Sequence, residues 1–212
     1  MNSEKESVPI DRSKALLTAA WMAVLLGMLM QGLSLLVVRP QLKAIITETV
    51  QKVSWSTLVC TGLAIGMTAA KSRAAWMGLA GVIAAPASFL IARALQKSLA
   101  QSLSVAGTGA PPVDVIVLVV AKAIQYGIFG ATIGYLTRTG KATAIACGAV
   151  GLLLGAAMAG LVIHFSLTTS PPAGTPTLVT RGMNELIFPV GCALVLYATD
   201  TLGRRLRSAA GT

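Results

Sequence analysis

Three basic residues, Lys52, Lys122 and Arg181, stand at equivalent positions in three similar stretches of the chain. The stretches read VQKVSWSTLV (50–59), VAKAIQYGIF (120–129) and VTRGMNELIF (179–188). Each has a valine two residues before the base and a pair of large apolar residues six and seven after it. The second and third add an amide three residues after the base, Gln125 and Asn184. Ammonium, guanidinium and amide groups all donate hydrogen bonds. These five residues are therefore the candidate contacts for an anionic solute or a lipid phosphate.

A second interpretation gives the same bases a structural role. Each is expected near the outer end of an apolar helix, where a lysine or arginine extends its charge to the interface and buries only its carbon chain. We favour this interpretation for the set. Lys122, which follows VDVIVLVVA, is expected to lie deepest, and an ionisable residue inside a membrane is a functional hypothesis by default. Glu185 is a further alternative, because it lies four residues after Arg181 and can neutralise it.

Residues that support catalysis or metal binding are sparse. The one histidine, His164, has no second ligand at metal-binding spacing. The three cysteines fall inside apolar stretches without a C-x-x-C pair, which predicts small packing residues. The sequence contains no H-E-x-x-H, G-x-S-x-G or phosphate-loop motif. We therefore expect no catalytic residue, no metal and no cofactor, and we expect that the protein is not an enzyme.

The composition indicates that membrane-spanning helices position these residues. Hydrophobic residues make up 55% of the 212 residues and charged residues 11%, with a mean hydropathy of +0.77, whereas soluble domains are about one quarter charged. A spanning helix needs about 20 apolar residues. Candidate runs lie at 16–38, 53–70, 74–92, 123–137, 142–163 and 186–199. We predict six spans. The first is expected to be retained, because it is too long for a signal peptide and lacks a cleavage site.

Internal similarity groups the six spans into three pairs. AAWM occurs at 19–22 and again at 74–77, and a related run of small residues opens the fifth span. We predict an all-α integral membrane protein built from three tandem helix-hairpin repeats. The expected divisions are a polar tail (1–13), repeats at 14–70, 71–138 and 139–203, and a basic tail (204–212). Two-span units enter the membrane the same way round, which predicts a pseudo-threefold bundle about the membrane normal. Amphipathic segments, such as 41–52, are expected on the outer interface.

Glycines recur at four-residue spacing inside the spans. The pairs are Gly62 and Gly66, Gly130 and Gly134, and Gly151 and Gly155. Lipid provides no hydrophobic drive between helices, so association depends on close backbone approach. We expect these six glycines to pack helices rather than to bind a ligand.

The second span of each pair carries most of the polar residues. A helix with one polar face should turn that face away from lipid, so we expect these spans near the axis and the first spans outside. The competing explanation is that serine and threonine hydroxyls bond their own backbone.

The distribution of charge predicts orientation and partners. Ten of the 17 bases lie in the N-terminal tail, the 71–73 and 138–141 turns and the C-terminal tail, which share one side if six helices alternate. Such density marks the cytoplasmic side. We therefore expect a protein of a plasma membrane, of the bacterial inner membrane type, with both termini cytoplasmic and in contact with anionic lipid headgroups. We expect no nucleic acid partner, and either a homo-oligomer or partner membrane subunits.

Two functions remain open at this point. The first is a channel or permeation protein for a small solute or anion, with the three bases at its outer mouth and Gln125 and Asn184 beneath. The second is a non-catalytic structural or accessory subunit that relies on glycine-mediated packing. The apolar inner halves of the second spans oppose the first function, since they form no continuous polar path.

Overall fold

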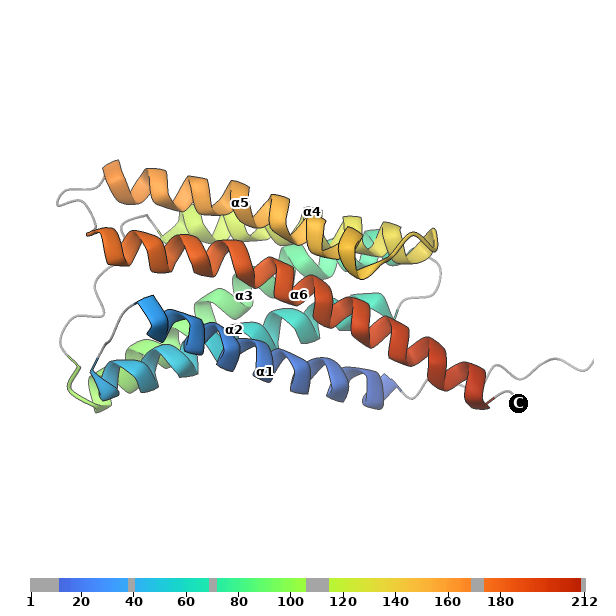
Figure 1. The fold of residues 1–212 in the computed structure, drawn as a ribbon, viewed down its shortest axis with the longest axis horizontal. Coiled ribbons are helices and arrows are strands. Elements are labelled where there is room, and N and C mark those ends of the chain that lie inside the picture. Colours follow the sequence, from blue (N-terminus) through green and yellow to red (C-terminus); the bar gives the residue numbers. More distant parts are fainter. Residues whose placement is uncertain (1–11, 38–40, 69–71, 106–114, 169–173, 211–212) are drawn as a thin grey trace, which may run out of the picture.

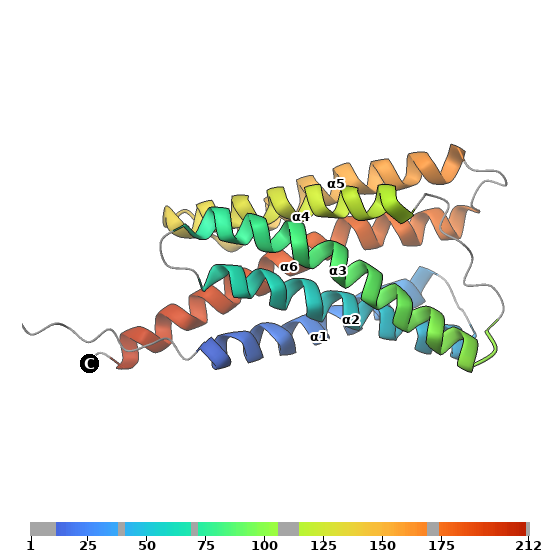
Figure 2. The same ribbon diagram turned by 180° about the vertical axis from the view of Figure 1, so that it is seen from behind.

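The computed structural model describes residues 12–37, 41–68, 72–105, 115–168 and 174–210. The described chain folds into six α-helices, as predicted. They are α1 (Arg12–Val37), α2 (Leu42–Met67), α3 (Arg73–Ser102), α4 (Val115–Arg138), α5 (Ala144–Thr168) and α6 (Thr175–Ala210). Figures 1 and 2 show the helices lying side by side along the long axis. Helix α1 begins and α6 ends at the same end of the bundle, which we name the terminal end; the opposite end is the distal end (Figure 1).

Helices that follow one another in the chain pack against one another. The most extensive contacts are α3 with α4, α5 with α6, α2 with α3 and α1 with α2. Helix α6 returns to pack on α1 and α2, while α4 contacts α5 less extensively. The structure does not confirm the predicted threefold repeat. A threefold axis would bring α2, α4 and α6 together equally, whereas α4 packs mainly on α3.

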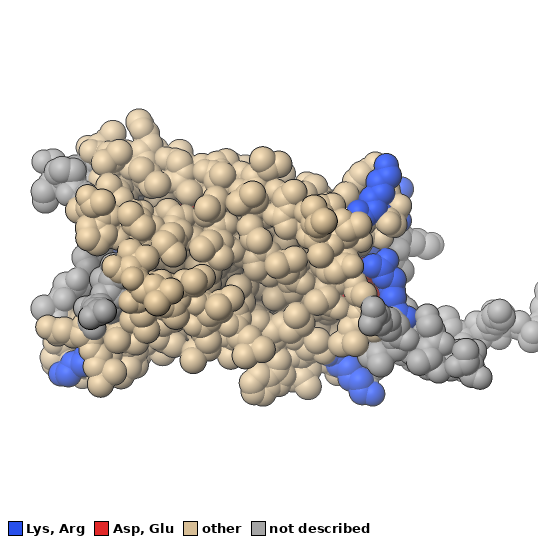
Figure 3. Space-filling model, in the orientation of Figure 1, with Lys and Arg blue, Asp and Glu red and all other residues tan. Residues whose placement is uncertain are grey.

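Five of the six helices are long and apolar enough to span a membrane: α1, α3, α4, α5 and the Thr175–Arg204 part of α6. These helices support a membrane-embedded protein with transmembrane helices. Helix α2 is not one of these five, and its first half carries Lys43, Glu48 and Lys52. Figure 3 shows lysine and arginine at the two ends of the visible face and an uncharged band between them. Large apolar side chains, such as Leu25, Ile83 and Leu153, are exposed along the helices.

The segment at 41–52, expected as an amphipathic helix that leads into the second span, is continuous with that span. Helix α2 runs without a break from Leu42 to Met67, because no proline or glycine interrupts its hydrogen-bond ladder before Gly62. Thr47 is buried within this stretch. Helix α6 likewise continues past the expected tail boundary at residue 204 and remains helical to Ala210.

The centre of the bundle is filled with apolar side chains. Among the five helices that are long and apolar enough to span a membrane, α6 and α4 bury the largest share of the residues in an 18-residue apolar stretch, 44% and 39%, against 28–33% for α1, α3 and α5. Fully buried side chains at the centre include Leu63 of α2, Phe129 and Ile133 of α4, and Leu196 of α6. These side chains fill the centre of the bundle on the terminal side of Lys52 and Lys122.

The six glycines of the four-residue pairs all lie at close helix contacts. A Cβ atom added at any of them would fall under 3.0 Å from an atom of a neighbouring helix. Gly62, Gly66, Gly130 and Gly134 face α3, whereas Gly151 and Gly155 face α6. Gly148 and Gly160, on the same helix as the last pair, have nothing within 4 Å at the corresponding position.

Candidate functional site

The deepest of the three bases, Lys122, forms an ion pair with Glu185 of α6, whose own side chain is 19% exposed. The Lys122 side chain is only 6% exposed, and it lies seven residues from the start of α4, or about 10 Å along the helix. The Lys122 ammonium also lies 5.4 Å from the ring centre of Trp55 and 5.9 Å from that of Tyr126. A desolvated ammonium near an aromatic face gains a cation–π attraction. Lys122 is therefore held inside the bundle by contacts with α2 and α6.

Gln125 and Asn184, the two predicted amides, lie close to this ion pair. Gln125 Oε1 accepts a long hydrogen bond of 3.4 Å from Lys122 Nζ. Its Nε2 donates to the Leu154 carbonyl of α5 at 3.3 Å. Asn184 lines the same pocket as Lys122 and Glu185. Both amides thus lie near the ion pair: Gln125 contacts Lys122 directly, and Asn184 lies at the pocket wall.

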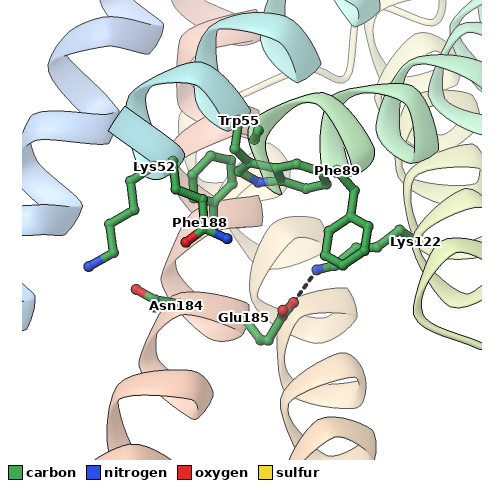
Figure 4. A pocket seen from close by; sticks show the side chains of 9 residues that line it. Lys52, Trp55, Phe89, Lys122, Asn184, Glu185 and Phe188 are labelled. Carbon is green, nitrogen blue, oxygen red and sulfur yellow. Dashed lines mark hydrogen bonds and ion pairs between the residues drawn. The ribbon is translucent and has the colours of Figure 1, made fainter. Parts of the chain in front are cut away.

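A pocket of about 140 Å³ opens between α2, α3, α4 and α6 at this level. Its polar wall is formed by Gln51, Lys52, Lys122, Asn184 and Glu185. Its apolar wall is formed by Ala92 and by the aromatic rings of Trp55, Phe89 and Phe188. Figure 4 shows Lys52 and Asn184 on one side and the Lys122–Glu185 pair on the other, with Trp55 and Phe89 above. The pocket combines charged groups with flat apolar surfaces, as small-molecule sites do.

Lys52 also lines the pocket, but its ammonium is bound by α1. It donates to Gln31 Oε1 at 2.8 Å and to Ser34 Oγ at 2.6 Å. Glu48, one turn earlier on α2, lies 3.7 Å away. Gln31 and Ser34 are both buried. The two polar residues of α1 are thus explained by their contact with a lysine on the neighbouring helix.

Arg181 lies apart from the other two bases. Its guanidinium donates to Ser166 Oγ of α5 at 3.0 Å, and Arg181 does not belong to the pocket lining. The three bases therefore have three different sets of partners, and only Lys52 and Lys122 share a cavity. In the described residues Glu185 pairs with Lys122 rather than with Arg181.

Sequence reasoning missed the role of two carboxylates. Glu185 is the partner of Lys122, and the buried Asp200 lies 3.4 Å from Arg73 and 2.8 Å from Arg204. The sequence does mark these two residues as unusual. The chain has only seven acidic residues, and these two fall inside an apolar helix. A carboxylate in such a helix requires a cationic partner. The sequence does not show which base on another helix supplies it.

Many hydroxyls in the helices serve their own backbone. Ser56 and Thr132 donate to carbonyls three and four residues back, as the competing explanation predicted. The buried Thr57 and Thr61 hydroxyls of α2 make no hydrogen bond in the described structure. Polar contacts at the pocket thus come from charged and amide groups, not from hydroxyls.

The described residues contain no group of three histidine, cysteine, aspartate or glutamate side chains that would hold a metal ion. No family model, no curated protein and no solved structure matches this chain.

Proposed function

We propose that this chain is a membrane permeation protein for a small organic anion, which binds in the pocket between α2, α3, α4 and α6. The Lys122–Glu185 pair at the pocket wall carries the proposal. The pair joins α4 to α6, two helices that otherwise have little direct contact. A solute carboxylate that competes with Glu185 for the ammonium would be bound and would loosen this connection in the same step.

The cost of burying charge supports a functional role for the pair. Moving two charges out of water is expensive, and a buried ion pair is often no more stabilising than apolar residues of the same size. Elsewhere in the bundle, close glycine contacts and large buried apolar side chains hold the helices together without charges. The ion pair is therefore poorly explained as a stabilising device, whereas intramembrane charges commonly mark solute paths.

The charge and size of the pocket support an anion with a short carbon chain. Two lysines and one carboxylate line the wall, and Glu48 lies 3.7 Å from the Lys52 ammonium. A solute anion that displaces Glu185 would take its place as the counter-charge of Lys122. A volume of about 140 Å³ has room for several water molecules, each of which needs about 10–15 Å³ of this kind of space. The rings of Trp55, Phe89 and Phe188 would contact the apolar part of the solute.

The solid core beneath the pocket favours a carrier over an open channel. Leu63, Phe129 and Leu196 fill the centre on the way to the terminal end. A solute bound in the pocket can pass only if helices separate. We further propose that α2 spans the membrane with the other five helices, its polar first half turned toward α1 and the pocket. The base-rich terminal end would lie in the cytoplasm, against anionic lipid of the plasma membrane.

Uptake by vesicles reconstituted with the full chain tests this function. Methanesulfonate is a suitable probe because it stays ionised and does not cross lipid as a neutral acid. Glycine betaine and tetramethylammonium provide zwitterionic and cationic comparisons. Uptake of methanesulfonate should exceed that of protein-free vesicles. It should fall about tenfold or more in the double variant Lys122→Met/Glu185→Leu. Lys97→Met, which removes an exposed base of α3, should leave uptake unchanged.

A structural or accessory subunit is the second candidate, favoured by the close backbone contacts at the six glycines. This function requires no solute path. Equal uptake by wild-type and protein-free vesicles for all three probes would favour it and would rule out the carrier for these classes of solute.

A further inference from the structure

Asp200 forms a second ion-paired centre on α6, at the terminal end. Its side chain is 5% exposed. One carboxylate oxygen lies 3.4 Å from the guanidinium of Arg73, at the start of α3, and the other lies 2.8 Å from Arg204. The Arg204 contact is internal to α6, four residues along the same helix. The Arg73 contact joins α6 to a different helix.

The two acids of α6 have the same relation to the rest of the fold. Glu185 pairs with α4 toward the distal end, and Asp200 pairs with α3 at the terminal end. Helices α3 and α4 pack extensively on each other, whereas α6 packs on α5, α1 and α2. The two acids are fifteen positions apart in α6, which corresponds to about 22 Å of helix. Ion pairs thus connect α6 to the α3–α4 hairpin at two separated levels.

Apolar packing fills the space between these two levels. Cys192 and Leu196 of α6 are fully buried. They belong to the same core cluster as Phe129 and Ile133 of α4. A route from the pocket to the terminal end must therefore pass this core and then the Arg73–Asp200 contact.

We propose that the two ion pairs are the two gates of the solute path, Lys122–Glu185 on the distal side and Arg73–Asp200 on the terminal side. This inference rests on the proposed permeation function. The gates open one at a time, as α6 and the α3–α4 hairpin separate first at one end and then at the other. Ion pairs suit this task because water that enters the opened end solvates the separated charges, while the closed pair needs no water.

The native cysteines supply a reporter between the gates. Cys60 and Cys192 are fully buried, and Cys192 lies seven residues from Glu185 and eight from Asp200. In a Cys147→Ala background, a membrane-impermeant methanethiosulfonate reagent is applied to the full chain from one side of the membrane at a time. The labelling rate of the thiol pair then reports water access from that side.

Arg73→Gln and Arg204→Gln form a matched pair of variants, since each leaves Asp200 with one arginine. Arg73→Gln removes the contact between helices and should raise labelling from the terminal side about tenfold, within the usual range of couplings between sites. Arg204→Gln removes the contact that Asp200 makes within α6 and keeps the Arg73–Asp200 contact between helices, so it should leave the rate near wild type. Glu185→Gln should raise labelling from the distal side alone.

Equal rates for Arg73→Gln and Arg204→Gln would overturn the terminal gate. An increase from both sides in either gate variant would also overturn it, since that pattern indicates general loosening. Size-exclusion profiles in detergent identify a variant that has lost its fold. If Arg73→Gln is such a variant, Arg73→Lys, which keeps the charge, should label at the wild-type rate, and faster labelling would contradict the proposal. If labelling follows these predictions but no probe is taken up, the two gates would be supported and the proposed class of solute would be wrong.

Discussion

The thiols of Cys60 and Cys192 lie 3.1 Å apart, sulfur to sulfur, where α2 meets α6 inside the core. Both helices contribute to the pocket wall, so a bond between the two sulfurs would fix two sides of the pocket to each other. Both thiols are fully buried in the closed bundle, so an oxidant reaches them through the apolar interior or when the helices separate.

Oxidation with copper-phenanthroline should join these two cysteines within one chain. Two thiols lose two protons and give two electrons to the copper complex, and a disulfide forms. After denaturation, a maleimide should then label one cysteine per chain, Cys147, instead of three. Uptake of methanesulfonate should stop and should return on reduction. A Cys192→Ser chain should show neither effect, and disulfide-linked dimers from wild type would contradict the predicted pairing.

Helix α5 offers a test of the glycine contacts. Gly155→Ala should lower the thermal unfolding temperature in detergent, because its Cβ would lie 2.6 Å from the Leu186 carbonyl oxygen. Overpacking of this kind costs about 1–3 kcal/mol. Gly148→Ala, about two turns earlier on the same helix, has open space around its added Cβ. It should be neutral or stabilising, since alanine favours helix by about 1 kcal/mol over glycine. Equal unfolding temperatures for the two variants would show that the α5–α6 contact is looser than described.

Helix formation could be predicted from the sequence because its signals are local. Apolar runs of about 20 residues and their breaks define five spans without knowledge of any contact. The deep position of Lys122 also follows from the apolar residues around it. The beginning of α2 was harder to predict. Its charged first half resembles an interfacial helix, although it belongs to the same continuous helix as the apolar second half.

The partners of the charges could not be predicted, because they depend on the order of helices in the bundle. The i, i+4 rule favours Glu185 with Arg181, but the structure pairs Glu185 with Lys122 of α4. Lys52 is bound by Gln31 and Ser34, which precede it by 21 and 18 residues. A threefold arrangement inferred from the repeats would have placed all three bases together. Small differences in helix packing decide such contacts, and periodicity does not record them.

Lys52 provides a prediction about the α1–α2 contact. Lys52→Met should lower stability by about 1–3 kcal/mol, because the buried Gln31 and Ser34 side chains lose their donor. Lys43→Met, which removes an exposed base from the first turn of the same helix, should change stability little. Thermal unfolding in detergent compares the two. A Lys52→Met chain as stable as Lys43→Met would mean that the ammonium is solvated and not held by α1.

Orientation can be tested with cysteines placed at the two ends of the bundle. In a chain without native cysteines, Ser72→Cys and Lys141→Cys at the terminal end should be protected from an impermeant maleimide added outside the cell. Ser104→Cys at the distal end should be labelled. The reason is the excess of bases at the terminal end, which is retained in the cytoplasm. Labelling of Ser72→Cys in intact cells would reverse the orientation.

The Lys122–Glu185 pair gives the sharpest separation of structure from function. Glu185→Leu alone leaves the buried Lys122 ammonium without its partner and should cost about 3–5 kcal/mol of stability. Lys122→Met should cost less, because the Glu185 side chain that it leaves unpaired is 19% exposed. The double variant replaces both with apolar groups and should recover most of that loss, since such replacements are often neutral. Thermal unfolding of the wild type, both single variants and the double variant gives the coupling between the two sites.

Uptake should not follow stability through this cycle. If the pair binds solute and closes the distal side, the double variant should be as stable as wild type and still fail to take up methanesulfonate. A structural pair predicts the opposite, because a restored fold would restore whatever the bundle does. A double variant that regains both stability and uptake would therefore remove Lys122 and Glu185 from the solute path and leave them as a contact between α4 and α6.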